Sequence, residues 1–253
     1  MITIACYNIK GGVGKTAAAV NLSFLAAQGG ANTVVWDLDP QGAASFYFRI
    51  KPRIRGGSFR LFQRKGELDE VIKATDYPRL DLVPADFSYR NMDLLLEQQR
   101  KPGRRLKKII KPLTSEYHFL FLDCAPSISL VSENIFASAD VLLVPTIPTT
   151  LSLRTLRQVQ DFCAEGDYGH LSVIPFFSMV DRRKTLHREI VGNRAGILGE
   201  APLSYIPYAS EVEQMGRRRA PLETYAHASS AARAYRDMWQ ELQPRLLALD
   251  RRR

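Results

Sequence analysis

Short apolar runs alternate with amphipathic segments along this chain. The runs are rich in β-branched and aromatic residues, and they occupy residues 2–7, 33–36, 80–83, 119–122, 141–144 and 171–177. Apolar residues also recur at helical spacing over residues 16–28, 91–99, 151–162, 185–197 and 228–249. Buried strands that alternate with helices are typical of an α/β fold with a mostly parallel sheet covered on both faces. Ligands of such folds bind beside the carboxyl ends of the strands.

The pattern contains no internal repeat and no low-complexity segment, so we expect a single domain over residues 1–253. Its last helix, about 228–249, is followed by a basic tail at 251–253. The basic, glycine-containing stretch 51–57 is predicted to be an exposed loop. The sequence has no run of eighteen apolar residues, and the first strand begins without a signal-peptide pattern. We therefore expect a cytoplasmic protein with no membrane span.

The composition allows a folded core and adds a basic bias. Hydrophobic residues make up 45% of the 253 residues, and 35 Lys and Arg against 26 Asp and Glu give a formal charge of +9. This excess favours a polyanionic partner, either nucleic acid or an acidic membrane face. Cys6, Cys124 and Cys163 are too scattered for a disulfide framework or a zinc site, so we expect them to be buried. The four histidines also lack ligand spacing.

A glycine-rich loop follows the first apolar run and leads into a helix. The loop reads Lys10-Gly11-Gly12-Val13-Gly14-Lys15-Thr16, and Ala17 comes next. Glycines let the backbone wrap around phosphate oxygens, and the start of the helix adds its positive end. In such a loop Lys15 reaches the β- and γ-phosphates, and the Thr16 hydroxyl binds Mg²⁺. The usual pattern requires glycine at position 9, where this chain has Ile9, so the loop is a variant form.

Carboxylates follow two of the other apolar runs. Asp37 and Asp39 come at the end of the second run, and strand alternation points both toward the same side. Asp123 directly follows the apolar run 119–122, as in a Walker B strand, and is expected to hold Mg²⁺. The sequence therefore predicts a Mg²⁺–nucleotide site built from the glycine-rich loop and these three acids.

These motifs together resemble the ParA/MinD family of P-loop ATPases. The loop matches the family's deviant Walker A box, K-G-G-x-G-K-T, and residues 37–42, D-L-D-P-Q-G, match its second box. Asp123-Cys124-Ala125-Pro126 resembles the family's D-x-x-P, and the likeness runs from residue 2 to about 247. The resemblance implies a P-loop NTPase fold of the SIMIBI type that hydrolyses ATP with Mg²⁺.

The resemblance also assigns roles to individual residues. In the family, the lysine that precedes the glycines crosses to the partner's nucleotide in an ATP-bound homodimer, and here it is Lys10. The second aspartate of the second box, Asp39, orients the attacking water, and the first, Asp37, supports Mg²⁺. Two later loops border adenine, which makes Met179, Asp181, Pro207 and Tyr208 candidate contacts.

A basic C-terminal region is the candidate nucleic-acid surface. Residues 182–253 contain 14 Lys and Arg against 8 Asp and Glu, which is +6 of the chain's +9. ParA-type proteins bind DNA without sequence preference through this region, and phosphate contacts alone would give such binding. The candidate contacts are Arg182, Arg183, Lys184, Arg217, Arg218, Arg219, Arg233 and Arg236. Many members carry an arginine where this chain has Tyr208, so no DNA contact is expected there.

The resemblance favours a positioning ATPase that dimerises on ATP, coats nucleoid DNA and is stimulated by a partner that carries the cargo. The cargo is left open among a plasmid, a chromosome region and a protein body such as a carboxysome or chemoreceptor cluster. An alternative is a MinD-like membrane ATPase, which requires an amphipathic C-terminal helix. An iron–sulfur relative is disfavoured, because Cys124 has no suitable partner cysteine.

Overall fold

The computed structural model describes residues 1–62, 68–99, 102–199 and 202–250. Its centre is a seven-stranded sheet with strand order β3-β4-β2-β5-β1-β6-β7. β3 pairs antiparallel to β4, and every other pairing is parallel. The strands are β1 Ile2–Cys6, β2 Thr33–Asp37, β3 Lys73–Ala74, β4 Leu80–Val83, β5 Phe119–Asp123, β6 Val141–Thr146 and β7 Ser172–Phe177.

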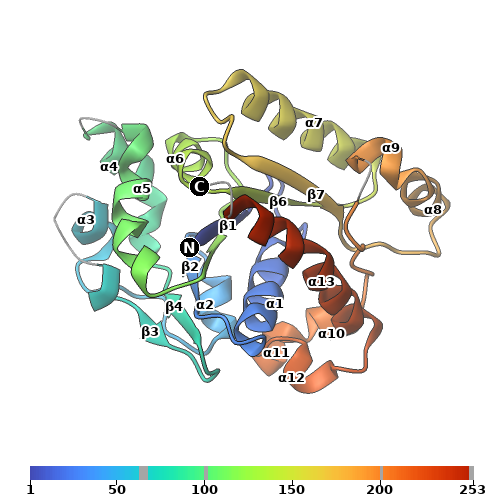
Figure 1. The fold of residues 1–253 in the computed structure, drawn as a ribbon, viewed down its shortest axis with the longest axis horizontal. Helices are drawn as coiled ribbons and strands as arrows, with labels where there is room; N and C mark the ends of the chain where they lie inside the picture. The colour runs from blue at the N-terminus through green and yellow to red at the C-terminus, as the bar shows by residue number, and fades with distance from the viewer. Residues whose placement is uncertain (63–67, 100–101, 200–201, 251–253) are drawn as a thin grey trace.

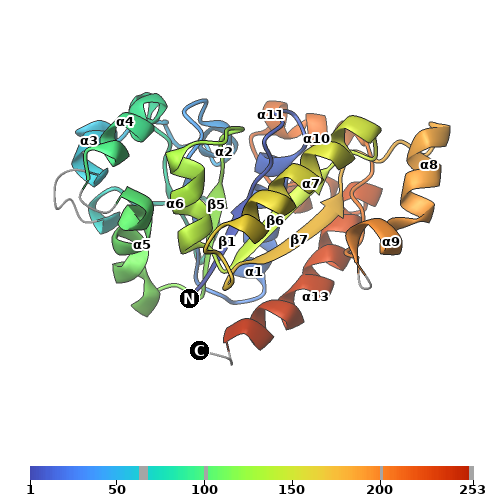
Figure 2. The same cartoon turned by 90° about the horizontal axis from the view of Figure 1, so that it is seen from above.

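Helices cover both faces of the sheet (Figures 1 and 2). The helices of eight or more residues are α1 Lys15–Gln28, α6 Leu130–Ser138, α7 Thr150–Glu165, α8 Thr185–Gly192 and α13 Ser230–Asp250. The shorter α-helices are α2 Ala43–Tyr47, α3 Gly57–Phe62, α4 Met92–Glu97, α5 Arg105–Ile110, α9 Arg194–Leu198, α10 Ser210–Glu213, α11 Met215–Arg218 and α12 Glu223–Ala226. The 3-10 turns are η1 Leu68–Glu70, η2 Phe87–Asn91, η3 Pro102–Arg104 and η4 Lys111–Ser115.

Strand alternation divides the buried side chains into two cores. Ile4 and Cys6 of β1 pack with α1 and α13 on one face, whereas Ala5 packs with α4, α5, α6 and α7 on the other. The apolar stripe of α13 belongs to the first core, where Met238 and Leu242 are fully buried. That stripe is therefore used for packing, as the mostly parallel, doubly covered sheet requires.

The six predicted strands are confirmed. β4 matches the predicted run 80–83, and the other five differ from prediction by one or two residues at their ends. The helix expected over 185–197 is instead two helices, α8 and α9. They meet at Gly192 and Asn193, both poor helix formers. Apart from residue 54, the segment 51–57 is largely exposed, as predicted for a loop. The three cysteines are all buried and free, as predicted.

The carboxyl ends of the parallel strands meet at one edge of the sheet, which is the upper edge in Figure 2. The pairing register places Asp37 of β2 opposite Asp123 of β5, and Asp123 opposite Cys6 of β1. Because the glycine-rich loop follows β1 directly, it lies at the same edge as these two aspartates. The topology thus brings together motifs that are more than 80 residues apart in the sequence.

Candidate nucleotide-binding site

The glycine-rich loop uses backbone conformations that suit glycine. Gly12 and Gly14 have φ of 69° and 96°, in the left-handed region. A Cβ at Gly14 would also lie 2.8 Å from Ser178 Oγ, so a side chain there would clash as well as strain the backbone. Gly14 caps α1 without a side-chain hydrogen bond, and the first turn of α1 carries no acidic residue. The positive end of α1 is therefore available to an anion.

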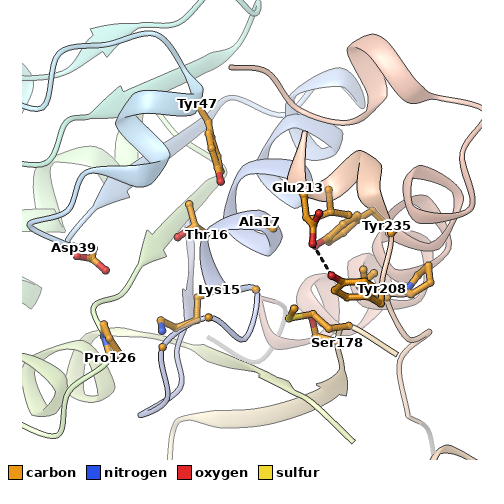
Figure 3. A pocket seen from close by; sticks show the side chains of 18 residues that line it. Lys15, Thr16, Ala17, Asp39, Tyr47, Pro126, Ser178, Tyr208, Glu213 and Tyr235 are labelled. Atoms are coloured by element: carbon orange, nitrogen blue, oxygen red, sulfur yellow. Dashed lines mark hydrogen bonds between the residues drawn. The ribbon is translucent and has the colours of Figure 1, made fainter. Parts of the chain in front are cut away.

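A cavity of about 300 Å³ lies against this loop (Figure 3). Asp39 and Pro126 border the loop on one side, and Tyr208, Glu213 and Tyr235 lie beyond it on the other. Its lining includes ten of the residues predicted for the site, namely Gly11, Gly12, Gly14, Lys15, Thr16, Ala17, Asp39, Met179, Pro207 and Tyr208. The polar side thus has the chemistry of a phosphate site, and the aromatic side that of a base site.

Lys15 is buried within the loop that it belongs to. Its Nζ donates to the carbonyl oxygen of Lys10 at 3.0 Å. Burial lowers the pKa of this amine, and the nearby charge of Asp123 opposes that shift. A bound phosphate would offer the amine a stronger, charged acceptor at the place where the loop closes.

Asp37 is completely buried and holds the segment that follows it. Its Oδ2 accepts hydrogen bonds of 2.7 Å from both the backbone N and the Oγ of Ser45, in α2. Burial raises the pKa of this carboxyl, and the hydrogen bonds from Ser45 partly oppose that shift. Asp37 therefore fixes α2 relative to β2, and it does not line the cavity itself.

Asp123 and Thr16 have the arrangement expected of a Mg²⁺ site. Thr16 Oγ1 donates to Asp123 Oδ1 at 3.2 Å, whereas Asp123 Oδ2 is buried without a hydrogen-bond partner. Burial and the neighbouring charge of Asp37 raise the pKa of Asp123 well above its usual range. A buried carboxylate oxygen without a partner is costly, and a cation is its natural counterpart. The two residues fit a divalent cation held mainly by phosphates and water.

Asp39 differs from the two buried acids because it lines the cavity and is partly exposed. Its Oδ1 accepts a hydrogen bond of 2.9 Å from the backbone N of Gln41, which fixes the carboxylate at the turn after β2. A carboxylate held in this way can accept a hydrogen bond from a water molecule in the cavity.

Lys10 directly precedes the glycines of the loop and is not among the residues that line the cavity. Its backbone N donates to Asn8 Oδ1 at 2.9 Å, and its Nζ lies 3.4 Å from the Oγ of Ser152 in the first turn of α7. The Lys10 amine is therefore held at α7, whereas its carbonyl oxygen accepts from Lys15 inside the loop.

The adenine candidates divide into two groups. Met179, Pro207 and Tyr208 line the cavity, and the Tyr208 hydroxyl donates to Glu213 Oε1 at 2.7 Å (Figure 3). Asp181 lies outside the lining, and its carboxylate is paired with the Arg183 guanidinium at 2.9 Å. Sequence reasoning did not identify several other lining residues, because in the sequence they read as core or loop positions: Tyr47, Ala209, Val212 and Tyr235.

The candidate DNA contacts also fall into two groups. Arg182, Lys184, Arg217, Arg218 and Arg233 are exposed. Three others are engaged within the chain. Arg183 pairs with Asp181, Arg236 pairs with Glu223 at 2.6 Å, and Arg219 donates to the carbonyl oxygen of Phe46. The exposed group is therefore the better candidate for contacts with phosphates.

The fold and the site define a P-loop nucleoside triphosphatase. A family model described as an AAA domain matches residues 1–165. The chain is 30% identical to the chromosome-partitioning ATPase Soj of Treponema pallidum, over 95% of this chain and 96% of that protein. This chain therefore belongs to the ParA/MinD family of P-loop ATPases.

Solved structures confirm the fold. The McdA–ATP complex of Cyanothece matches with a TM-score of 0.84 and 18% identity, over 96% of both chains. Cobyrinic acid a,c-diamide synthase of Mycobacterium smegmatis with bound ADP and magnesium matches with a TM-score of 0.73 and 23% identity, over 91% of this chain and 96% of that one. In the part of the chain that the structure describes, no helix is both long and apolar enough to cross a bilayer.

Proposed function

We propose that this chain is a positioning ATPase that binds ATP as a homodimer, binds DNA without sequence preference and hydrolyses ATP when a cargo-bearing partner engages it. The observation that carries the proposal is the position of Lys10, which lies beside the phosphate loop but outside its own cavity. The Lys10 side chain does not line the cavity of its own chain, and we infer that it acts on the nucleotide of a second copy.

The chain's own residues divide the work at the site. Lys15 and the loop amides bind the phosphates, Asp39 orients the attacking water, and Lys10 of a second copy neutralises charge as the phosphoryl group leaves. Thr16 and Asp123 would hold Mg²⁺, which when bound neutralises phosphate charge. Asp37 would support the site indirectly, by fixing α2 through Ser45. The aromatic side of the cavity, with Tyr208, would bind adenine.

Exposed apolar side chains at the edge of the carboxyl ends support dimerisation through this edge. Phe46, Ile128 and Leu151 follow β2, β5 and β6, and they are 46%, 54% and 67% exposed. Apolar side chains gathered at one edge are typical of an interface. Two copies facing each other there would bury them and bring each Lys10 toward the other copy's loop.

The dimer is tested by measuring molar mass with light scattering after size exclusion. We expect wild type to shift to twice its mass with ATP and Mg²⁺ but not with ADP, and Asp39→Ala to remain in the dimer because it binds ATP without turning it over. An Asp39→Ala protein that hydrolyses ATP at the wild-type rate would contradict the role assigned to that residue. A wild-type monomer at saturating ATP would contradict the dimer.

DNA binding is tested by fluorescence anisotropy with a duplex across a salt series. We expect binding in ATP that weakens steeply with salt, and Arg217→Glu to bind more weakly because a phosphate contact becomes a repulsion. Lys107→Glu makes the same charge change on α5, away from the candidate contacts, and is the matched control. Equal binding by the Arg217→Glu variant and the wild type would remove α11 from the DNA surface.

A membrane-bound positioning ATPase is the second candidate, and the structure disfavours it. The C-terminal apolar stripe that would enter a bilayer is buried against the sheet, with Tyr235, Met238 and Leu242 at most 2% exposed. Pelleting with anionic vesicles, with and without ATP, separates the two candidates.

A further inference from the structure

A basic segment between α2 and α3 was recognised in the sequence but has no role in the proposed site. It reads Arg49-Ile50-Lys51-Pro52-Arg53-Ile54-Arg55, so that basic residues alternate with apolar ones. Its four basic residues are exposed, whereas Ile54 is only 4% exposed. Ile54 therefore anchors the segment, while the four charges around it face solvent.

The segment is held in place by specific contacts. The backbone N of Ile54 donates to Asp86 Oδ2 at 2.8 Å, in the loop that follows β4. Pro52 packs on Gly42 so closely that a Cβ at Gly42 would lie 2.8 Å from Pro52 Cβ. A fixed backbone means that the exposed charges lose less freedom when they bind a ligand.

The segment forms one wall of a hollow of about 960 Å³. Five basic side chains and one acidic side chain line it among the described residues: Lys51, Arg53, Arg55, Arg60, Lys73 and Glu70. Glu70 already pairs with Arg60. Arg53 also lies close to the Asp86 carboxylate. The remaining basic charges still outnumber the acidic ones and repel one another, and an anionic ligand would relieve that repulsion.

The hollow is connected to the candidate DNA contacts at the other end of the chain. Arg49 Nε donates to the carbonyl oxygen of Arg219 at 3.1 Å, and its NH2 donates to that of Arg218 at 3.3 Å. α2 and α11 lie next to each other along the upper edge in Figure 2. The arginines of α11 and the segment 49–55 therefore adjoin on one surface, although they are about 165 residues apart in the sequence.

We propose that the hollow lined by Lys51, Arg53 and Arg55 binds the sugar–phosphate backbone of DNA and extends the surface that begins at α11. The inference rests on the proposed DNA binding and adds a second contact region outside the C-terminal part of the chain. The contacts would be to phosphates, because the phosphate oxygens carry the negative charge that these guanidinium and ammonium groups attract.

The test is duplex binding by the triple variant Lys51→Ala/Arg53→Ala/Arg55→Ala, measured by anisotropy with ATP over a salt series. The slope of log K against log salt falls by about 0.9 for each lost contact with duplex phosphate, so a decrease of about 2 to 3 is expected. At low salt the affinity should fall at least tenfold. The single variant Arg53→Ala should show about one third of the slope change expected for the triple variant.

The matched control is Lys107→Ala/Lys108→Ala/Lys111→Ala, which removes the same charge from exposed positions on α5 and η4. Lys107 and Lys111 line a different hollow, beside Met1 and Leu249. The control should keep the wild-type slope. Melting temperatures of all variants check that each one folds.

Three outcomes would overturn the inference. They are an unchanged slope in the segment triple, an equal loss in the control triple, and a loss of binding to anionic vesicles with no loss of DNA binding. The last would assign the hollow to a lipid surface. Failure of the wild type to bind duplex at all is a separate result that removes DNA binding from the proposed function itself.

Discussion

Arg49 and Arg219 each brace the segment that carries the other, although 170 residues separate them. Arg49 Nε donates to the carbonyl oxygen of Arg219, and Arg219 Nε donates to that of Phe46, both at 3.1 Å. The Arg219 guanidinium also lies 4.6 Å from the centre of the Phe46 ring. The pair links α2, which Asp37 holds through Ser45, to α11, which carries candidate DNA contacts.

Two substitutions at Arg219 distinguish the stabilising contacts of its side chain from the strain of its backbone. Arg219 has φ of 52°, where a residue other than glycine is strained. Arg219→Ala keeps that strain and loses the contacts, so the free energy of unfolding should fall by about 1 kcal/mol. Arg219→Gly loses the same contacts but relieves the strain, so it should be less destabilising. Urea unfolding measures both, with the exposed Arg157→Ala on α7 as control, and a larger loss in the glycine variant would contradict the account.

Asp123→Asn should not lower the stability of the nucleotide-free protein, but it should reduce the stabilisation that ATP and Mg²⁺ give. Without nucleotide the variant should melt no lower than wild type, because a buried carboxylate without a full set of partners is replaced by a neutral group. Wild type with ATP and Mg²⁺ at 100 times Kd gains about 2.7 kcal/mol, and the variant should lose most of that gain.

Differential scanning fluorimetry gives both readings for the Asp123 variant. Wild type with ATP and excess chelator is the control, and it should resemble the variant. A variant that melts well below wild type without nucleotide would show that Asp123 stabilises the empty fold.

Alanine variants of the two lysines in the phosphate loop should lose different activities. Lys15→Ala should abolish nucleotide binding, because the amine inside the loop is lost. Lys10→Ala should still bind ATP, since Lys10 lies outside the cavity. Its turnover should be lower by a factor on the order of 10³, as for loss of a charge supplied by a partner. Binding is measured with a fluorescent ATP analogue and turnover by phosphate release, and full turnover in the Lys10 variant would exclude its catalytic role.

Asp86 should make stability depend on pH in the acid range. Burial alone would raise its pKa, but hydrogen bonds from Ile54 and Ser88 and the charge of Arg53 lower it below the usual value. A carboxyl with a lowered folded pKa stabilises the protein above the unfolded pKa of about 3.9 and loses this contribution as pH falls through the folded value.

The urea midpoint should therefore fall between about pH 5 and pH 3 by more in wild type than in Asp86→Asn. Asp161→Asn, at an exposed position of α7, is the matched control. Parallel midpoints for wild type and Asp86→Asn across this range would contradict the role of Asp86.

The sequence predicted the parts of the site that depend on local chemistry. Glycines, Lys15 and Thr16 follow a strand directly, so their positions in the loop could be inferred from the residues alone. Asp37 and Asp123 could be placed at one edge because parallel strands end together, although their pairing in register could not be known. The predicted strands were correct because buried parallel strands are uniformly apolar.

The sequence could not predict contacts made between distant segments. Tyr235 reads as a core position of the last helix, and it is buried, yet it also lines the cavity. The short helices α2, α3 and α5 have too few residues for a periodic pattern. The engagement of Arg219 with Phe46 depends on how α2 and α11 pack, which no local signal encodes.

Lys10 Nζ lies 3.4 Å from Ser152 Oγ and does not line the nucleotide cavity. Under the proposed dimer mechanism, a solitary molecule would hold its triphosphate with one positive charge too few, because its own Lys10 does not line the cavity. Turnover per molecule would therefore rise with local crowding, and an isolated molecule would keep its nucleotide intact. The position of one side chain would thus make the rate of ATP hydrolysis depend on how many identical molecules are close by.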